Sequence, residues 1–393
     1  MERAGQPVSA VVLRGITWDH PRGRNPCLAT ADAWGAIERD VQVRWSARSL
    51  HDFGAAPVDE LAERYDLLVI DHPFVGAVAR GRCLAPLGDL LPASALTEVR
   101  SASVGPAYDS YVYDGQLWAL PIDVAGHVSV CRPDLLDRAG AAEPATWEEI
   151  LDLAAGLAKR AGPRVALPLK AVDITMAFIS LCANAGAQPF AAAPRAVDRE
   201  TGLRALAVLR RLAGAGPAGA AALNPIGLLD QMVGTDDIAY CPLLFGYVSY
   251  SGAAPGRNLR FGPIAAGPAG RTGGVLGGAG LAISARCEHP EAVARYAGFV
   301  AGPQVQKGLY VSSGGQPADR RAWLDPAVNN ATGDFFSRTL ASLDGSYLRP
   351  RYDGFVDLQE TAGQLLQPCV LGAADPETTL DDLDRLHRSH NGS

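Results

Sequence analysis

The first seventy residues alternate strand-length apolar runs with helical segments, and this alternation restricts the fold more than any other feature of the chain. Residues 10–13 form a short apolar run, and residues 26–38 carry apolar side chains at helical spacing. Residues 41–45 alternate as a strand does, and residues 65–71 form another apolar run of strand length. Strands that are separated by helices pair in parallel through right-handed crossovers. The sequence therefore predicts an α/β fold that begins with a βαβ unit.

A second α/β layer is predicted after Asp114-Gly115, a dipeptide typical of a type I′ hairpin turn. Thr146 and Glu149 have the spacing of a capping box, which indicates the start of a helix. A glycine-rich stretch, residues 262–280, leads into a short strand and then a helix that opens at Pro290. Further elements are expected as strands at 165–169 and 238–244, helices at 172–183, 203–212, 225–233, 303–309, 334–343 and 355–366, and a polar, frayed end after Asp384.

The composition excludes several classes of protein. The chain has 393 residues, with 35 Lys and Arg against 42 Asp and Glu, so its net charge is −7. At roughly 100 to 200 residues per domain, this length fits two domains. The acidic balance and the lack of a basic run give no electrostatic footprint for nucleic acid. No stretch approaches the ~18 consecutive apolar residues of a membrane helix, so a membrane-spanning protein is not expected.

The N-terminal residues and the cysteines indicate a compartment. Residues 1–9 lack the basic end and the apolar run of a secretory signal, so we expect a cytoplasmic protein, with an exported mature form as the alternative. The seven cysteines lie 46 or more residues apart, and their odd number argues against a complete disulfide framework. No CxxC pair is present, and no spacing of His and Asp indicates a metal site.

A short repeat, Asp-His-Pro, closely follows two of the predicted parallel strands. The first copy begins at Asp19 and the second at Asp71. Loops at the carboxyl ends of strands line the ligand crevice in open α/β sheets, so we expect the two copies to lie near each other at the edge of a cleft. The structural alternative is that each Asp caps a following turn, which the Pro stiffens.

Three segments resemble the ABC-transporter solute-binding proteins of the extracellular sugar-binding type. They are residues 113–136, 147–149 and 277–293. The resemblance implies a two-lobed clamp of the type II periplasmic-binding-protein kind, in which each lobe is a mixed sheet flanked by helices and the ligand binds between the lobes. The implied bounds are 1–120 plus 266–314 for lobe one and 121–265 plus 315–393 for lobe two, with hinges near 120–124, 261–265 and 312–317.

The resemblance also implies a set of ligand-binding residues. In lobe one they follow the first and third strands or lie at the crossover, and in lobe two they lie in loops. Tyr247 and Tyr250 would stack on a ligand, although aromatic rings lie as often in a core. Arg349 and Arg351 would bind a carboxylate or phosphate, or else pair with Asp353 or Asp357. The full set is Trp18, Asp19, His20, Arg22, Asp71, His72, Asp123, Tyr247, Tyr250, Gly278, Arg349 and Arg351.

Two functions remain open from the sequence. The first is binding of a small polar molecule by a monomer, with an ABC permease as partner if the protein is exported. The second is a cytoplasmic, cofactor-independent lyase, isomerase, cyclase or hydrolase on the same fold. In such an enzyme His20 or His72 would transfer protons, oriented by Asp19 or Asp71. The glycine-rich stretch precedes a strand instead of following one, so it is not a dinucleotide fingerprint, and no cofactor is expected.

Overall fold

The computed structural model describes residues 10–191, 194–251, 258–268, 270 and 273–391. The chain divides into two compact units, and each is described here by itself. Unit 1 comprises Met1–Ser103, Tyr108–Asp123 and Gly278–Ala322, and unit 2 comprises Val104–Ala107, Val124–Gly277 and Trp323–Ser393. The first main division between the units follows Asp123, and the hinge expected near residues 120–124 stays a prediction.

The other two main divisions between the units follow Gly277 and Ala322. Within unit 2, the Tyr347 N–H donates to the Gly274 carbonyl (2.7 Å) and the Leu276 N–H donates to the Tyr347 carbonyl (2.9 Å). These bonds join residues 274–276 to Tyr347 within unit 2. The hinges expected near residues 261–265 and 312–317 stay predictions.

Unit 1 is built on a mixed sheet with the strand order β2-β1-β3-β10. Strand β1 (Val11–Trp18) pairs in parallel with β2 (Val41–Arg48) and with β3 (Leu67–Ile70), as the alternation of strands and helices predicts. Strand β10 (Leu276–Ile283) adds to β3 in the antiparallel direction through Gly280–Ile283. All four side chains of β3 are buried, which is typical of a central strand covered on both faces.

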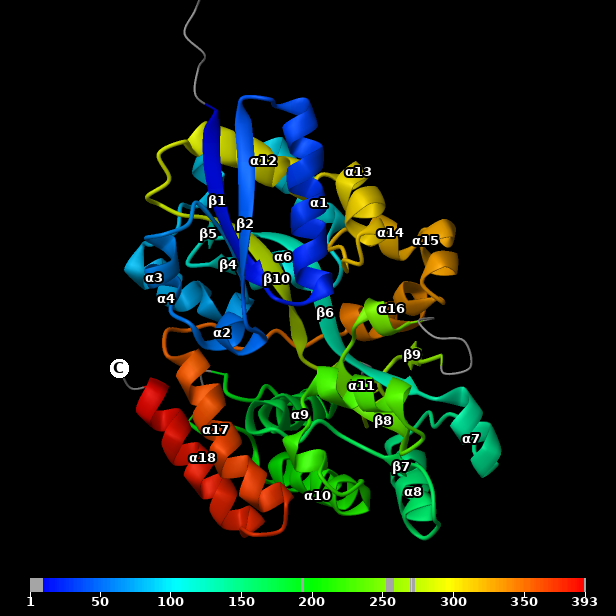
Figure 1. Ribbon diagram of the computed structural model, residues 1–393. Coiled ribbons are helices and arrows are strands. Elements are labelled where there is room, and N and C mark those ends of the chain that lie inside the picture. The colour runs from blue at the N-terminus through cyan, green and yellow to red at the C-terminus, as the bar shows by residue number, and fades with distance from the viewer. Residues whose placement is uncertain (1–9, 192–193, 252–257, 269, 271–272, 392–393) are drawn as a thin grey trace, which may run out of the picture. The chain divides into compact units, whose positions relative to one another are not determined.

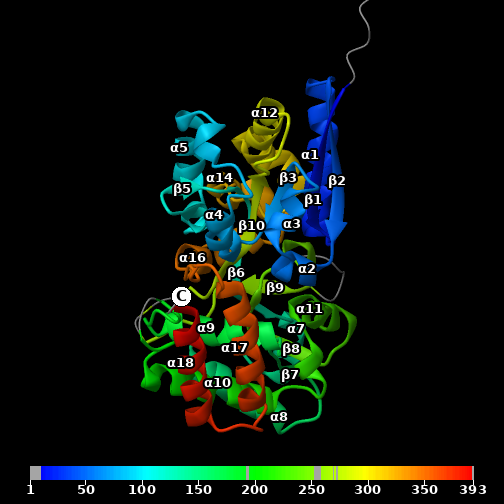
Figure 2. The same ribbon diagram turned by 90° about the vertical axis from the view of Figure 1, so that its left-hand side faces the viewer.

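Helices cover this sheet. The helix α1 (Pro21–Ile37) packs on β1 and β2 and contacts α12 (Pro290–Ala301). Figure 2 shows α5 (Ala93–Ala102) and β2 at opposite sides of unit 1. The remaining helices of unit 1 are α2 (Leu50–Ala55), α3 (Val58–Ala62), α4 (Val75–Gly81) and α13 (Pro303–Val305). Two more, α6 (Ala107–Ser110) and α14 (Arg320–Trp323), belong to unit 1 except for one terminal residue each, Ala107 and Trp323. Three short helical turns (His72–Phe74, Leu87–Asp89, Gln306–Tyr310) and the hairpin of β4 (Val112–Tyr113) and β5 (Gln116–Leu117) complete the unit.

The first strand and the first helix differ from their predicted bounds. Strand β1 extends to Trp18 instead of ending at residue 13, so Trp18 is the last residue of a strand and not part of a loop. The helix α1 begins at Pro21 instead of residue 26, because His20 caps its N-terminus and Pro21 occupies the first helical turn, where a missing N–H costs nothing.

Unit 2 contains the sheet β6-β8-β7, with β9 paired to β6. Strand β6 (Leu120–Cys131) is buried along its whole length and pairs antiparallel with β8 (Ile238–Phe245) and β9 (Arg260–Gly262). The predicted strand at 165–169 is only β7 (Arg164–Val165), because the Leu169 N–H bonds to the Leu223 carbonyl outside the sheet ladder. The helices are α7 (Pro133–Ala139), α8 (Trp147–Ala158), α9 (Ala171–Asn184), α10 (Arg199–Ala215), α11 (Pro225–Gly234), α15 (Pro326–Ala331), α16 (Phe335–Asp344), α17 (Phe355–Val370) and α18 (Pro376–Asn391), with short turns at Ala220–Ala222 and Val248–Tyr250.

The chain is helical as far as Asn391, the last described residue, so the frayed end predicted after Asp384 is wrong. Figure 1 shows α18 running beside α17. Leu380, Leu383 and His387 are buried, and their spacing places them on one face of the helix. The Asp384 carboxylate accepts a hydrogen bond from the Ala196 N–H at 2.8 Å. Burial of this apolar face orders a segment that is polar on average.

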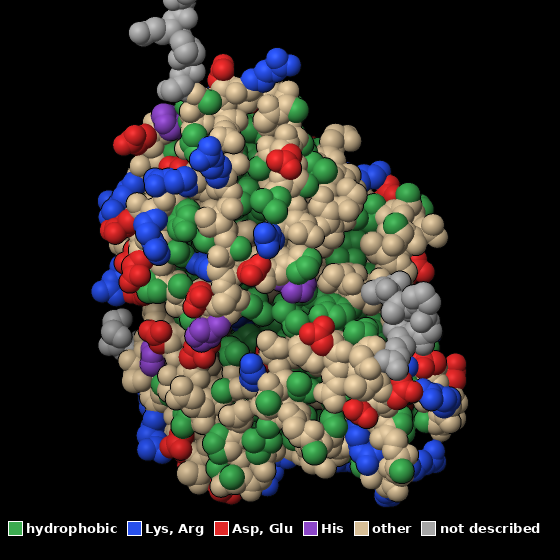
Figure 3. Space-filling model, viewed as in Figure 1, with side chains coloured by type: hydrophobic (Ala, Val, Ile, Leu, Met, Phe, Trp, Pro, Cys, Tyr) green, Lys and Arg blue, Asp and Glu red, His purple; other side chains and the backbone are tan. Residues whose placement is uncertain are grey.

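Side chains of both charges are interspersed over the face of the described residues in Figure 3. Many of them form ion pairs within a unit, for example Arg286 with Glu63 at 2.9 Å and Arg260 with Glu143 at 2.9 Å. This distribution agrees with the absence of a basic run in the sequence.

Candidate functional site

The two Asp-His-Pro copies follow neighbouring parallel strands of unit 1. Gly15 and Ile16 of β1 pair with Leu67 and Leu68 of β3, so the two strands end at the same edge of the sheet. That edge is where ligands bind in open α/β sheets. The register therefore places the two loops at the same edge of the unit 1 sheet.

In the first copy, the histidine side chain makes the hydrogen bond that caps the following helix. The Arg22 N–H donates to Nδ1 of His20 at 3.1 Å, which makes His20 the N-cap of α1. Because Nδ1 accepts, a neutral His20 ring carries its proton on Nε2. Asp19 does not cap the turn; its side chain is 63% exposed and lies 3.6 Å from the Arg24 guanidinium. Asp19 and His20 are thus the polar side chains that this loop presents at the surface.

Trp18 lies in the core of unit 1. Only 4% of it is exposed, and its ring centroid lies 5.1 Å from that of Phe53. Its indole also packs against Gly23, where a Cβ atom would come within 2.3 Å of the ring. Gly23 is therefore required for the close approach of α1 to Trp18.

Arg22 and Asp123 form a buried ion pair within unit 1. Arg22 is 4% exposed and Asp123 is 2% exposed. The guanidinium donates from both Nε (3.0 Å) and Nη2 to the two carboxylate oxygens. Burial raises the pKa of Asp123, while the Arg22 charge and a hydrogen bond from the Gln316 backbone act to lower it. These two residues of the predicted set bind each other.

In the second copy, the aspartate side chain makes the hydrogen bond that caps the following turn. Asp71 accepts a hydrogen bond from the His72 N–H at 2.8 Å and caps a short turn, as the structural alternative expects. Oδ1 of Asp71 also lies 3.1 Å from Nδ1 of His72. The His72 side chain is 1% exposed and stands edge-on to Tyr111, whereas 17% of the Asp71 side chain is exposed. Asp71 is the more accessible member of this pair.

Arg48 belongs to the same edge and was not singled out from the sequence. It ends β2, where it is the partner of Trp18 in the parallel register. Its guanidinium lies over the Phe53 ring at 5.5 Å and donates to the Val69 carbonyl at 3.0 Å. Its Nε and Nη1 are buried and have no hydrogen-bond partner among the described residues. Burial lowers the pKa of Arg48 to about 10. The one feature of the sequence that could have pointed to Arg48 is its position at the end of an alternating strand.

The predicted tyrosines lie in unit 2. Tyr250 donates to the Asp230 carboxylate at 2.6 Å, and its ring stands edge-on to that of Tyr247. Burial, followed by the bond to Asp230, raises the pKa of Tyr250. Tyr247 is 6% exposed, whereas Tyr250 is half-buried. Gly278, assigned to unit 1, has φ of 127°, a conformation that side chains rarely adopt.

The predicted arginines differ in exposure. Arg349 is 4% exposed and donates to the Gln359 side chain at 3.0 Å, while Arg351 is half-buried. The same part of unit 2 holds a serine–histidine contact that the sequence gave no reason to expect. Ser180 Oγ lies 2.8 Å from Nδ1 of His127 and accepts from the Val275 N–H at 2.9 Å.

The Ser180–His127 contact is part of the core. His127 is 3% exposed, and Ser180 is fully buried. Burial, with the nearby Arg349 charge, lowers the pKa of His127 to about 3. The ring is therefore neutral at pH 7, and either Ser180 Oγ or His127 Nδ1 donates in this hydrogen bond, according to the tautomer of the ring. This bond joins β6 to α9.

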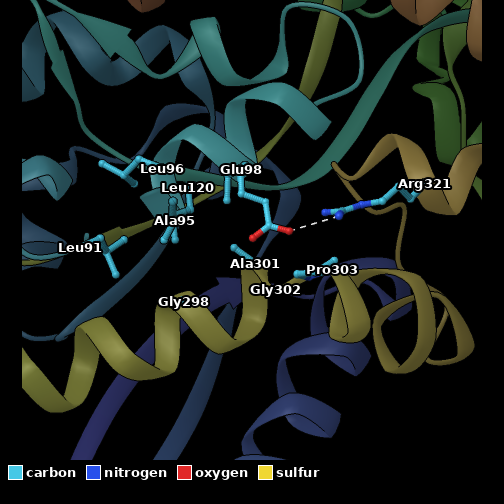
Figure 4. Close-up of a pocket in the computed structure, with 11 residues that line it drawn as sticks. Leu91, Ala95, Leu96, Glu98, Leu120, Gly298, Ala301, Gly302, Pro303 and Arg321 are labelled. Carbon is cyan, nitrogen blue, oxygen red and sulfur yellow. Dashed lines mark hydrogen bonds and ion pairs between the residues drawn. The ribbon is translucent and has the colours of Figure 1, made fainter. Parts of the chain in front are cut away.

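Two cavities lie within single units. Figure 4 shows one of about 70 Å³ in unit 1, where leucine and alanine side chains of α5 and α12 meet and the carboxylate of Glu98 points toward Arg321 at 3.2 Å. Another, of about 320 Å³, lies in unit 2 and is lined by Leu135, Leu157 and Pro163 with Arg138 and Arg160. Neither cavity is lined by a residue of the predicted set. The described residues contain no group of three or more His, Cys, Asp or Glu side chains that could hold a metal ion.

Solved structures identify the fold. The GacH receptor of Streptomyces glaucescens, described unliganded and with acarbose, is 18% identical, with a TM-score of 0.82 over 98% of this chain and 99% of that one. The maltose-bound MalE3 of T. maritima is 16% identical, with a TM-score of 0.83 over 97% and 100%. A solute-binding protein of Agrobacterium radiobacter in complex with ribitol is 18% identical, with a TM-score of 0.79 over 98% and 100%. The chain therefore has the type II periplasmic-binding-protein fold.

The family follows from the sequence match. The model of the bacterial extracellular solute-binding protein family matches residues 55–333, and this chain belongs to that family. It is a solute-binding protein, as the resemblance implies. No curated protein sequence matches the chain. Within the described residues, no helix combines the length and apolar character needed to cross a membrane.

Proposed function

We propose that the protein binds a sugar or a polyol and delivers it, as a monomer, to an ABC permease. The observation that carries the proposal is the family match over residues 55–333, together with fold likeness across 97% or more of the chain to proteins solved with maltose, ribitol or D-mannitol. Solutes of this class present hydroxyl groups, which need carboxylate acceptors and N–H donors.

The accessible polar groups at the edge of the unit 1 sheet suit such a solute. Asp19 and Asp71 supply carboxylate oxygens, and His20 supplies a ring whose Nδ1 is already used by the backbone. Trp18, Arg22, His72 and Asp123 are each less than 5% exposed, so they support this surface from beneath. In unit 2, Tyr250 and Arg351 are the half-buried members of the predicted set. The position of the solute in a cleft between two lobes stays a prediction.

A thermal-shift screen tests the proposal. The panel is maltose, ribitol, D-mannitol and tagatose, with glycine and citrate as solutes of other classes. A solute at 100 times its Kd adds about 2.7 kcal/mol to the free energy of unfolding, so binding in the micromolar range is visible at millimolar concentration. Stabilisation by at least one sugar or polyol, and by neither control, supports the proposal. Stabilisation by glycine or citrate alone contradicts it.

Three variants then test the surface. Asp71→Asn and His20→Ala are expected to raise the Kd of the stabilising solute at least tenfold, because the first replaces a charged acceptor oxygen by an N–H donor and the second removes the imidazole ring. His51→Ala is the matched control, since His51 is an exposed histidine of α2 in unit 1. Unchanged affinity in both Asp71→Asn and His20→Ala would show that the solute binds elsewhere.

The enzyme alternative predicts a different result from the same samples. A binding protein leaves its solute chemically unchanged, whereas an enzyme converts it. The solute is incubated with the protein and followed by NMR over hours. Appearance of a product that is lost in His20→Ala or His72→Ala would favour the enzyme.

A further inference from the structure

The buried pair of Arg22 and Asp123 connects three segments of unit 1 that are far apart in sequence. Arg22 lies in the first turn of α1, directly after the loop that carries Asp19 and His20. Asp123 is the last residue of β6 that belongs to unit 1, and it forms an isolated bridge with Pro317. The neighbouring residue Gln316 donates a backbone hydrogen bond to the Asp123 carboxylate. One carboxylate thus binds both α1 and the segment around residue 317.

Within unit 1, the Asp123 carboxylate accepts hydrogen bonds from the Arg22 guanidinium and from the Gln316 backbone. Nε and Nη2 of Arg22 approach its two oxygens in the bidentate geometry that makes such pairs strong and directional. Both side chains are at least 95% buried. A buried ion pair adds little net stability over an apolar pair, but loss of one partner costs several kcal/mol because the other charge remains buried. The pair is thus better suited to fixing position than to adding stability.

The position that it fixes is that of the loop after β1. The N–H of Arg22 donates to Nδ1 of His20, and the N–H groups of Gly23 and Arg24 donate to the His20 carbonyl at 2.9 and 2.8 Å. Three successive N–H groups, starting at the residue that Asp123 holds, therefore bond to His20. The residue whose side chain Asp123 binds is therefore the residue whose backbone N–H bonds to the His20 ring.

We propose that Arg22 and Asp123 are positioning residues for solute binding: they do not contact the solute but hold the His20 loop in its binding geometry. This inference rests on the proposed function and revises the expectation that both residues bind ligand directly. It assigns direct contact at this loop to Asp19 and His20 alone.

Hydrogen exchange in the solute-free protein gives the first test. In Asp123→Asn, the amides of Arg22, Gly23 and Arg24 are expected to exchange at least tenfold faster than in the parent. The matched control is Asp236→Asn in unit 2, which also removes a carboxylate from a buried arginine, Arg132, at 3.0 Å. That control should leave the three amides unchanged. A change of less than twofold in Asp123→Asn would overturn the proposal without reference to any solute.

A double variant keeps the test valid if Asp123→Asn folds poorly. Arg22→Met combined with Asp123→Leu replaces the pair by apolar side chains of similar size, which buried ion pairs often tolerate. It is expected to unfold at nearly the parent denaturant concentration and yet show fast exchange at the amides of Gly23 and Arg24. Parent-like exchange at these two amides in the folded double variant would also overturn the proposal.

Affinity measurements distinguish a positioning role of the pair from direct contact with the solute. Kd values for maltose and ribitol are measured by calorimetry for the parent and for the double variant. A positioning role predicts that both Kd values rise by the same factor, at least tenfold. A rise for one solute only, or for neither, contradicts it. If the parent binds neither solute nor any other member of the panel, the proposed function fails, while the exchange experiment still decides whether the pair holds the loop.

Discussion

Asp173 makes the stability of unit 2 depend on pH in an unusual direction. It lies in the first turn of α9, and its Oδ2 is buried without a hydrogen-bond partner among the described residues. Burial raises its pKa to about 7; Lys170 acts to lower the pKa, and Glu360 of α17 raises it further. An aspartate with this pKa binds its proton more tightly in the folded protein than in the unfolded chain, where the pKa is about 3.9.

The sign of the effect follows from linkage. At about pH 3 and below, Asp173 is protonated in both states and makes no difference to the stability. Between about pH 4 and 7 the folded state holds more protons, so stability falls as the pH rises, and above pH 7 the full penalty remains. A shift of about 3 pH units corresponds to about 4 kcal/mol as an upper limit. Partial exposure of the residue and the favourable dipole at a helix N-terminus reduce this to roughly 1 to 3 kcal/mol.

Asp173→Asn removes the charge and keeps the shape. We expect the variant to be more stable than the parent by roughly 1 to 3 kcal/mol at pH 8 and nearly equal to it at about pH 3. Urea unfolding at both pH values, followed by tryptophan fluorescence and circular dichroism, measures the difference. The control is Asp152→Asn, which removes the same charge from an exposed position on α8. Equal stability of parent and Asp173→Asn at pH 8 would refute the reasoning.

Three further predictions concern single groups. Tyr310→Phe removes a buried hydroxyl that has no hydrogen-bond partner among the described residues, so urea unfolding should show stability unchanged or raised by about 1 kcal/mol; a loss above that would show that the hydroxyl is satisfied. Thr146→Ala breaks the capping box of α8 and should cost about 1 kcal/mol, whereas Thr146→Ser should cost less; equal losses would contradict the cap. In a thiol titration of the native protein, Cys83 and Cys287 should react before the five buried cysteines, and rapid reaction of all seven would contradict the burial.

Helix caps and turns, which depend on a few neighbouring residues, were predicted correctly from the sequence. The capping box of Thr146 and Glu149 begins α8 as predicted, and Asn224 caps α11 with Pro225 in its first turn. Asp114 and Gly115 both adopt positive φ (52° and 75°), as a type I′ turn requires. In each case the residues that determine the conformation are also the residues that adopt it, so no distant contact can change the outcome.

Burial and contacts that depend on residues far apart in the chain were predicted less accurately. The buried face of α18 is recognisable only when α17 and α10 are placed beside it, so the polar average composition of that segment led to a wrong prediction. Trp18 was expected to face a ligand, but α1 and Phe53 enclose it. The partners Arg22 and Asp123 are 101 residues apart, and nothing in either local sequence indicates the other.

The sequence by itself determined the α/β class, the family and the pair of loops after β1 and β3, because periodic apolar runs and strand order are local or repeated properties. Only the tertiary structure decided which side chains of those loops reach the surface. Asp19 is exposed and Arg22 is buried, although both lie within one turn of His20. Exposure depends on what the rest of the chain places against each residue, and for Arg22 that is Asp123.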